Sequence, residues 1–220
     1  MNSIENTYIC LAAPLLLAIL VMQKDGRRSL SFVLAGMTAS LLSAYITTFL
    51  AGAAGVDAAI ASHEIAPAVE ETMKCLPLVF YLLVFEPEKR FIIPGTLMVA
   101  VGFATFENVC YLTSYGTEGL MRVLVRGFGT GAMHVLCGVI MSLGFFLLWD
   151  RIWLQTFGGF ALLSFVITIH AIFNVLVNQE GPVFWIGSAI PLTAVLVYLL
   201  VFRRKVDHAQ KKETQGGRNP

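Results

Sequence analysis

Charged residues are scarce in this sequence: only 13% of its 220 residues are Asp, Glu, Lys or Arg, whereas about 25% is usual. Apolar residues make up 57% of the chain, against roughly 45–50% in an ordinary globular protein. The 15 basic and 14 acidic residues nearly cancel, so no excess positive charge is available for binding a nucleic acid. The composition excludes a disordered chain and a water-soluble domain, and it predicts a protein embedded in a lipid bilayer.

The sequence also lacks the patterns of several known kinds of site. Its four cysteines lie in apolar stretches, which excludes a secreted disulfide framework, and we interpret them as small core residues: Cys10, Cys75, Cys110 and Cys137. The apolar stretches contain no H-E-x-x-H, G-x-S-x-G or G-x-G-D motif, so zinc-helix, serine and aspartyl proteases are not favoured. A Cys–His nucleophile could be drawn from Cys137 and His134, but a buried apolar cysteine seldom forms a thiolate.

Seven apolar segments approach or exceed the length of about 20 residues that a membrane span needs. They predict an all-α fold, a polytopic membrane bundle of about seven helices, with spans at residues 8–22, 30–51, 66–85, 91–111, 128–149, 153–177 and 183–202. Because no internal repeat or second domain is visible, we expect residues 1–202 to form a single transmembrane domain. Residues 203–220 are polar and basic, and we expect them to be a disordered cytoplasmic tail.

The basic residues predict how this bundle is oriented, because Lys and Arg accumulate on the cytoplasmic side of a membrane. Twelve of them follow the first, third, fifth and seventh spans. The opposite side has two, Arg122 and Arg126, within residues 119–127, which are apolar enough to lie along the membrane interface as a short helix. The N-terminus is therefore expected outside the cell and the C-terminus in the cytoplasm.

Polar side chains interrupt the third to sixth spans, where each ionisable group costs at least about 2.5–3.5 kcal/mol. They are Glu70, Glu71 and Lys74 in the third span, Glu107 and Asn108 in the fourth, His134 in the fifth, and His170 and Asn174 in the sixth. At about 1.5 Å per residue, Glu70, Glu107 and both histidines lie roughly 6–10 Å below the outer ends of their spans. Chance placement would scatter them over both leaflets, so we predict one site near the extracytoplasmic face.

The spacing within each helix agrees with a shared site. Lys74 lies three and four residues after the two glutamates, so it shares a helix face with both, and His170 shares a face with Asn174. Three glycines follow the face of His134 and predict that another helix approaches it closely: Gly127, Gly131 and Gly138.

Three carboxylates beside a single lysine cannot all be ionised in a low dielectric. A protonated carboxyl, a histidinium, a metal ion or water from the outer face must compensate, and each is also a way of activating water. We expect Glu70 or Glu71 to act as the base and Lys74 to balance its charge. His170 with Asn174 can supply hydrogen bonds to an oxyanion. Glu107 and His134 can position water, deliver a proton or bind metal.

These residues resemble the motif series of the PrsW intramembrane proteases, which are bacterial relatives of the CAAX prenyl endopeptidase and bacteriocin-processing superfamily. The motifs follow in order over roughly residues 66–174: Glu70-Glu71-x-x-Lys74, Phe103-x-x-x-Glu107-Asn108, His134 and His170-x-x-x-Asn174. The resemblance implies a multi-pass hydrolase of a bacterial plasma membrane that cleaves a single-pass membrane protein on its extracytoplasmic side, a site-1 cleavage. Anti-sigma factors are the expected substrates.

One departure from that pattern leaves the mechanism open. The CAAX-type relatives have a histidine where this chain has Glu107, and they use a glutamate-activated water without an essential metal. Here a zinc mechanism stays open beside the metal-free one, because a catalytic zinc ion needs only three protein ligands. The candidate ligands are Glu71, Glu107, His134 and His170.

Other interpretations compete with a protease. The glutamate pair could cap the start of the third span, and the histidines and amides could be structural hydrogen-bonding groups. His63 and Glu64 are interpreted as loop residues that border the site. The rival functional class is a proton- or ion-coupled transporter, and a receptor is a third. The polar set keeps to one side of the membrane and no inverted repeat is evident, which favours the protease.

Overall fold

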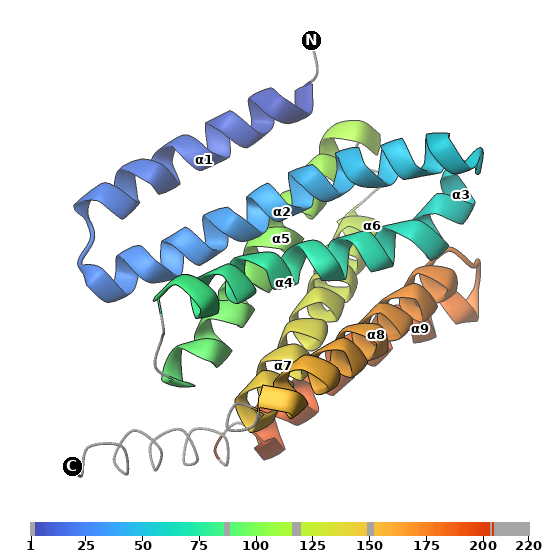
Figure 1. The fold of residues 1–220 in the computed structure, drawn as a ribbon. Helices are drawn as coiled ribbons and strands as arrows, with labels where there is room; N and C mark the ends of the chain where they lie inside the picture. The colour runs from blue at the N-terminus through green and yellow to red at the C-terminus, as the bar shows by residue number, and fades with distance from the viewer. Residues whose placement is uncertain (1–2, 86–88, 116–119, 149–151, 203, 205–220) are drawn as a thin grey trace, which may run out of the picture.

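The computed structural model describes residues 3–85, 89–115, 120–148, 152–202 and 204. These residues form helices and short helical turns, with no strand among them, so the all-α prediction is confirmed. In chain order the elements are α1 Ser3–Val21, α2 Lys24–Ala54, α3 Ala58–Ile60, η1 Ala61–Ile65, α4 Ala66–Phe85, η2 Lys89–Phe91, α5 Ile92–Tyr115, α6 Leu120–Val125, η3 Arg126–Thr130, α7 Gly131–Leu148, α8 Ile152–Val177, α9 Pro182–Val197 and η4 Tyr198–Phe202 (Figure 1). Apart from Arg204, the predicted tail lies outside the described residues.

Six helical segments in the described chain are long and apolar enough to cross a membrane: Ile4–Val21, Lys24–Ala54, Ile92–Ser114, Val123–Leu148, Thr156–Val177 and Pro182–Val201. The predicted third span, α4, has the predicted limits and 20 residues, but its three ionisable side chains keep it from qualifying by composition. Because α4 packs against α2, α5 and α8, we treat it as the seventh span.

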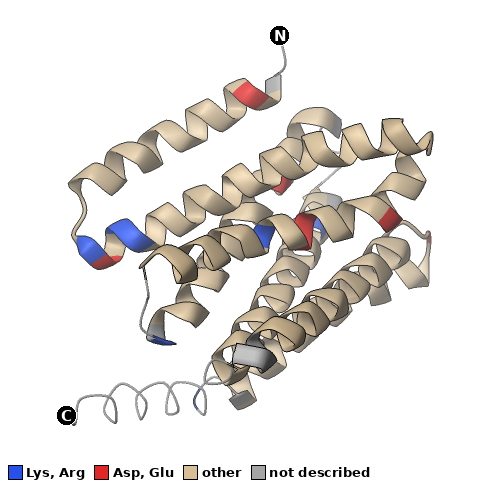
Figure 2. Cartoon of the chain, in the orientation of Figure 1, with Lys and Arg blue, Asp and Glu red and all other residues tan. Residues whose placement is uncertain are grey.

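The distribution of polarity is the reverse of that in a water-soluble protein. Large apolar side chains are exposed along most helices, Leu83 and Leu200 among them, while Lys74, His134 and His170 are buried. Figure 2 shows few charged residues on the helices, with a mixed acidic and basic group on α4 inside the bundle and basic residues at the start of α2. A surface of this kind is stable in lipid, and the charged group inside it needs a polar partner for every atom.

Five helices enclose the interior of the bundle. Helix α2 contacts α4 and α5, α5 contacts α7, α7 contacts α8, and α8 contacts α4, which closes the ring. Helix α1 packs on the outside against α2 and α5, and α9 packs against α7 and α8 (Figure 1). The four helices with the predicted site residues, α4, α5, α7 and α8, are therefore all members of this ring.

Glycine allows α2 and α5 to cross in backbone contact. A Cβ atom on Gly36 would lie 2.1 Å from the carbonyl oxygen of Val99, and one on Gly102 would lie 2.1 Å from that of Val33. The close approach predicted around His134 holds only at Gly138, where a Cβ would meet Ala100 at 2.9 Å. It is wrong at the other two predicted positions, Gly127 and Gly131, which have nothing within 4 Å, because a glycine stripe does not show which helix face has a neighbour.

We expect Gly36→Ala to destabilise the protein by about 1–3 kcal/mol or more, because the added methyl group overlaps a backbone that cannot turn aside. Gly52→Ala is the matched control on the same helix, since no atom lies within 4 Å of its Cβ position. That control should be neutral or stabilise by about 0.5–1 kcal/mol through helix propensity. Unfolding in mixed micelles measures both, and equal effects would contradict the close crossing.

A tight turn connects α2 to the helical run that contains the first site residues. Gly55 ends α2 in the left-handed region at φ 69°, and its N–H bonds to the carbonyl oxygens of Ala51 and Gly52. Two residues later the Asp57 carboxylate accepts from the N–H of Ile60 at 2.8 Å and caps α3. Elements α3, η1 and α4 then follow without interruption, which sets the position of the glutamates.

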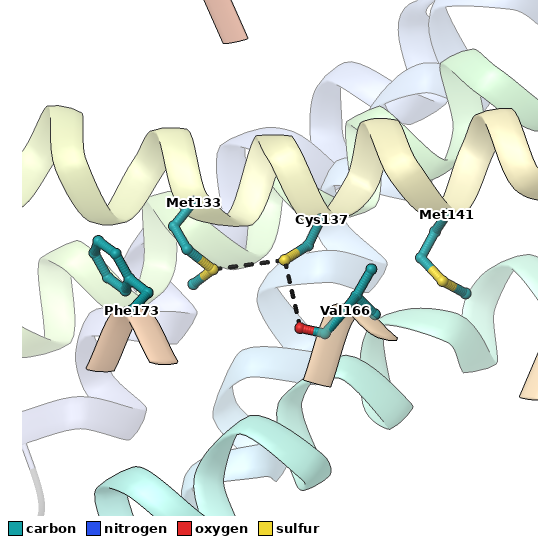
Figure 3. Packing of buried hydrophobic residues seen from close by; sticks show 5 residues of the cluster. All are labelled: Met133, Cys137, Met141, Val166 and Phe173. Carbon is teal, nitrogen blue, oxygen red and sulfur yellow. Dashed lines mark hydrogen bonds between the residues drawn. The ribbon is translucent and has the colours of Figure 1, made fainter. Parts of the chain in front are cut away.

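The apolar core lies mainly between α7 and α8. Its buried members are Met133, Cys137, Met141, Val166 and Phe173 (Figure 3). The Cys137 sulfur lies 3.6 Å from the Met133 sulfur and 3.9 Å from the Val166 carbonyl oxygen, so its interpretation as a core residue is confirmed. All four cysteines are free, but Cys75 and Cys110 are only half-buried and Cys10 is exposed. For Cys10 the prediction is wrong, because α1 packs on the outside of the bundle.

Candidate active site

Lys74 lies at the centre of a buried polar network formed by α4, α5, α7 and α8. Its Nζ donates to Oε1 of Glu71 at 2.6 Å and contacts Nδ1 of His134 at 3.0 Å. The exposed fractions are 7% for the lysine, 2% for Glu71 and 0% for His134. The Phe103 ring packs beside both side chains, 4.9 Å from Nζ of Lys74 and 5.1 Å from the imidazole centroid of His134. Water is thus kept from this side of the lysine.

His170 joins the network through the same glutamate. Its Nδ1 lies 2.7 Å from Oε1 of Glu71, a pure acceptor when ionised, so Nδ1 is the protonated nitrogen and Nε2 has the lone pair. This Nε2 faces Oε2 of Glu70 at 3.6 Å. That oxygen is buried and has no hydrogen-bond partner among the described residues. Two lone-pair atoms that face each other in a dry site need a proton, a water molecule or a metal ion between them.

Glu107 closes the other side of the network. Its Oε2 pairs with Nε2 of His134, and its Oε1 accepts from Arg126 at 2.7 Å. The Arg126 guanidinium also lies over the Tyr111 ring, 4.4 Å from its centroid. Because Lys74 donates a hydrogen bond to Nδ1 of His134, the hydrogen of the imidazole ring is on Nε2, which donates to Glu107. The carboxylate of Glu107 is therefore balanced by a guanidinium in addition to the shared histidine.

Arg126 is a site residue that the sequence reasoning missed. It was assigned with Arg122 to the membrane interface, and for Arg126 this is wrong, because α6, η3 and α7 follow one another and place it within the candidate span Val123–Leu148. The side chain of Arg122 lies outside the described residues. The available signal was the spacing: Arg126, Thr130 and His134 recur every four residues and so share one helix face.

Two π-helical turns, η1 and η3, precede site residues. In η1 the Ala66 N–H bonds to the carbonyl oxygen of Ala61, and Pro67 has no N–H to offer. The carbonyl oxygen of Ser62 instead accepts from Nδ2 of Asn174 at 2.8 Å. This bond ties α8 to the turn before α4. His63 and Glu64 are helical within η1, so their assignment to a loop is wrong.

Six of the eight predicted site residues are therefore in mutual contact: Glu70, Glu71, Lys74, Glu107, His134 and His170. The two amides are placed differently. One N–H of Asn174 is engaged by Ser62, as expected for a bond between helices, and its role at an oxyanion stays a prediction. The side-chain oxygen of Asn108 is buried without a hydrogen-bond partner in the described chain.

Three of these residues form a group that fits a metal ion. Glu70, His134 and His170 each offer one ligand atom, and these atoms lie within 4.8 Å of one another. One carboxylate and two imidazoles match the ligands of a catalytic zinc site. The unpartnered oxygen of Glu70 and the free Nε2 of His170 fit directly, and the Glu71 carboxylate on Nδ1 is the usual outer partner of a metal-binding histidine. Both ring nitrogens of His134 are already paired, one with Lys74 and one with Glu107, so His134 would bind a metal ion only after one of these contacts opens.

The histidines of this group are predicted zinc ligands, but its glutamate is not one of the two that the sequence predicts. Glu71 and Glu107 were predicted as ligands, but each is already held by a cation and a histidine. Glu70, which was predicted only as a base, takes their place. Sequence spacing cannot make this choice, because Glu70 and Glu71 are adjacent and their directions depend on the rotation of α4 about its axis.

A cavity of about 840 Å³ opens next to the network, between the α5–α6 region and the α8–α9 connection. Its lining includes Arg126, which pairs with Glu107, and Thr130 and Phe173, which lie one turn from His134 and His170 along the chain. Polar groups from the α8–α9 connection, among them Gln179 and Glu180, line its opposite side. The cavity leads from the predicted outer end of these helices toward the site.

Comparison with known proteins gives one match. The model of a family described as PrsW family intramembrane metalloprotease matches residues 27–203, which is most of the chain and includes every residue of the network. No curated protein matches the chain, and no solved structure matches it.

Proposed function

The chain belongs to the PrsW family of intramembrane metalloproteases, and from this we propose that it cleaves a single-pass membrane protein near the outer face of a bacterial plasma membrane. Family membership makes it a multi-pass membrane peptidase and lends nothing to the transporter alternative. The shared depth of the polar residues and the basic loops on the opposite side support cleavage near the outer face. Anti-sigma factors remain the substrates that the resemblance implies.

The observation that carries this proposal is the unpartnered carboxylate oxygen of Glu70 opposite the free Nε2 of His170. A water molecule placed between them would donate one proton to the carboxylate and one to the imidazole nitrogen. Loss of the first proton to Glu70 makes the water a nucleophile toward a peptide carbonyl. The proton can then pass from Glu70 to the leaving amine, so that the carboxyl group ends ionised as it began.

The remaining residues hold these two groups in place. Glu71 accepts from His170 and from Lys74, which fixes the imidazole with Nε2 toward Glu70. Lys74 supplies the positive charge that keeps Glu71 ionised in a buried site. His134, which Glu107 holds through Nε2, packs nearly perpendicular to His170 at a centroid distance of 5.2 Å.

A divalent metal ion would be held by Glu70, His134 and His170, and it would supply Lewis-acid activation of water and of the peptide carbonyl. Zinc suits one carboxylate and two imidazoles best among the common ions. The Glu71 carboxylate on Nδ1 would then orient His170. The description of the family as metalloproteases supports this version over the metal-free one.

The function is tested with the purified full chain in detergent and a single-pass test substrate labelled at both ends. We expect cleavage within a few residues of the outer membrane boundary, mapped by mass spectrometry of the products. The same preparation in proteoliposomes should show no ion or proton flux. Flux without cleavage would contradict the protease and favour a transporter, and cleavage at the cytoplasmic boundary would contradict the placement of the site.

A further inference from the structure

A second large cavity, about 950 Å³, is a groove between α2 and α4 that none of the six network residues lines. Beyond its basic end, the α2 side consists of four small residues and two larger ones: Ser31, Ala35, Thr38 and Ala39, with Phe32 and Leu42. Its α4 side consists of larger apolar residues: Met73, Leu76, Pro77, Phe80, Tyr81 and Phe85. The groove is thus apolar along its length and has no part in the proposed hydrolysis.

One end of this groove is strongly basic. Lys24, Arg27 and Arg28 from the first turns of α2 line it, and no acidic residue of the described chain does. The Arg28 guanidinium stacks 3.7 Å from the Phe91 centroid, yet its Nη1 is buried and has no hydrogen-bond partner among the described residues. A buried cationic donor without a partner costs stability unless a ligand satisfies it. These positions face the cytoplasmic side in the orientation that the basic loops predict.

The length and charge of the groove favour a lipid. From Arg28 to Leu42 it extends about 21 Å along α2, somewhat more than one leaflet, which is roughly half of the ~30 Å apolar thickness. A phospholipid of one leaflet offers acyl chains for the apolar part of the groove and an anionic headgroup for its basic end.

We propose that this groove binds one anionic phospholipid of the cytoplasmic leaflet. Its phosphate binds Lys24, Arg27 and Arg28, and its acyl chains lie along the small residues of α2 against α4. The phosphate oxygens accept from the free Nη1 of Arg28 and supply its missing partner. The cytoplasmic leaflet is the anionic one, which makes such a lipid available at this depth. This binding does not depend on the proposed proteolysis.

Native mass spectrometry of the purified full chain tests the site, by titration with phosphatidylglycerol or with phosphatidylcholine of the same acyl chains. We expect one tightly bound phosphatidylglycerol, with at least about tenfold higher affinity than phosphatidylcholine, because each basic residue contributes about fivefold. Arg28→Gln should lower the phosphatidylglycerol affinity about fivefold and the phosphatidylcholine affinity by less, because phosphatidylcholine has no net charge. Arg28→Lys keeps the charge and should keep the preference, which separates charge from the packing on Phe91.

Two further variants complete the test. Arg204→Gln removes an exposed charge that does not line the groove, and it should leave both affinities unchanged. Ala35→Phe fills the groove without altering its charge, and it should weaken the binding of both lipids. Equal affinities for the two lipids, or equal losses in Arg28→Gln and Arg204→Gln, would overturn the proposal. Normal lipid binding in Ala35→Phe with a raised KM for the protein substrate would also overturn it and assign the groove to the substrate.

Discussion

Glu70→Gln is expected to lower kcat by about a thousandfold or more while the protein stays folded. Glutamine has the same size and can occupy the same position, but it cannot accept a proton or supply negative charge opposite Nε2 of His170. Folding should tolerate the change, because Oε2 of Glu70 has no hydrogen bond to lose among the described residues. The measurement is kcat on the single-pass test substrate, with thermal unfolding of the same samples.

Glu64→Gln is the matched control for this substitution. Glu64 lies in η1, less than two helical turns before Glu70, but its side chain is exposed and outside the network. Its loss should leave kcat within about a factor of two, because its exposed side chain is not part of the network. Wild-type activity in Glu70→Gln would contradict the role given to this carboxylate. Equal losses in the two variants would show that the effect is not specific to the network.

Metal content of the same samples separates the two versions of the mechanism. If Glu70 is a ligand, Glu70→Gln should lose its divalent ion together with its activity, because three protein ligands are the minimum for a catalytic zinc site. We expect this result, since the family is described as metalloproteases. Wild-type protein that is active after complete removal of metal would contradict it and leave Glu70 as the base alone.

The second large effect is on stability: Glu71→Gln should destabilise the protein by about 3–5 kcal/mol. Oε1 of Glu71 accepts from both Lys74 and His170, and all three side chains are buried. Neutralising the carboxylate leaves the lysine ammonium in the bundle without its ion-pair partner. Reversible unfolding in mixed micelles, with wild-type protein and Glu64→Gln in parallel, measures the change.

A double substitution tests whether the loss comes from that pair. Lys74→Met alone should also destabilise, because it leaves the Glu71 carboxylate without its cation. In Glu71→Gln with Lys74→Met no buried ammonium is left, so the double variant should be more stable than the sum of the single losses predicts. An additive result would contradict the coupling that the 2.6 Å contact implies. Glu71→Gln should also lose activity, because the carboxylate that holds His170 is lost.

Much of this arrangement was predictable because hydrophobic length and the cost of buried charge are properties of the sequence itself. The limits of α4 agree with the prediction, and the apolar lengths indicated the six other spans to within a few residues, apart from the starts of α1 and α2. The shared depth of Glu70, Glu107 and the histidines predicted one site, and the structure brings them together. A helix rises by the same amount at every residue, so depth follows from counting.

Partners could not be predicted in this way, because they depend on how each helix is rotated and on which helix it crosses. Counting along α4 cannot show that Glu71 pairs with Lys74 and His170 while Glu70 keeps a free oxygen. The contact of Arg126 with Glu107 required that η3 continue into α7 instead of lying along the interface. The sequence by itself determined the helical membrane bundle and indicated six of the residues that meet in the network. Tertiary packing alone decided which carboxylate is free, because a side chain's partners come from other helices.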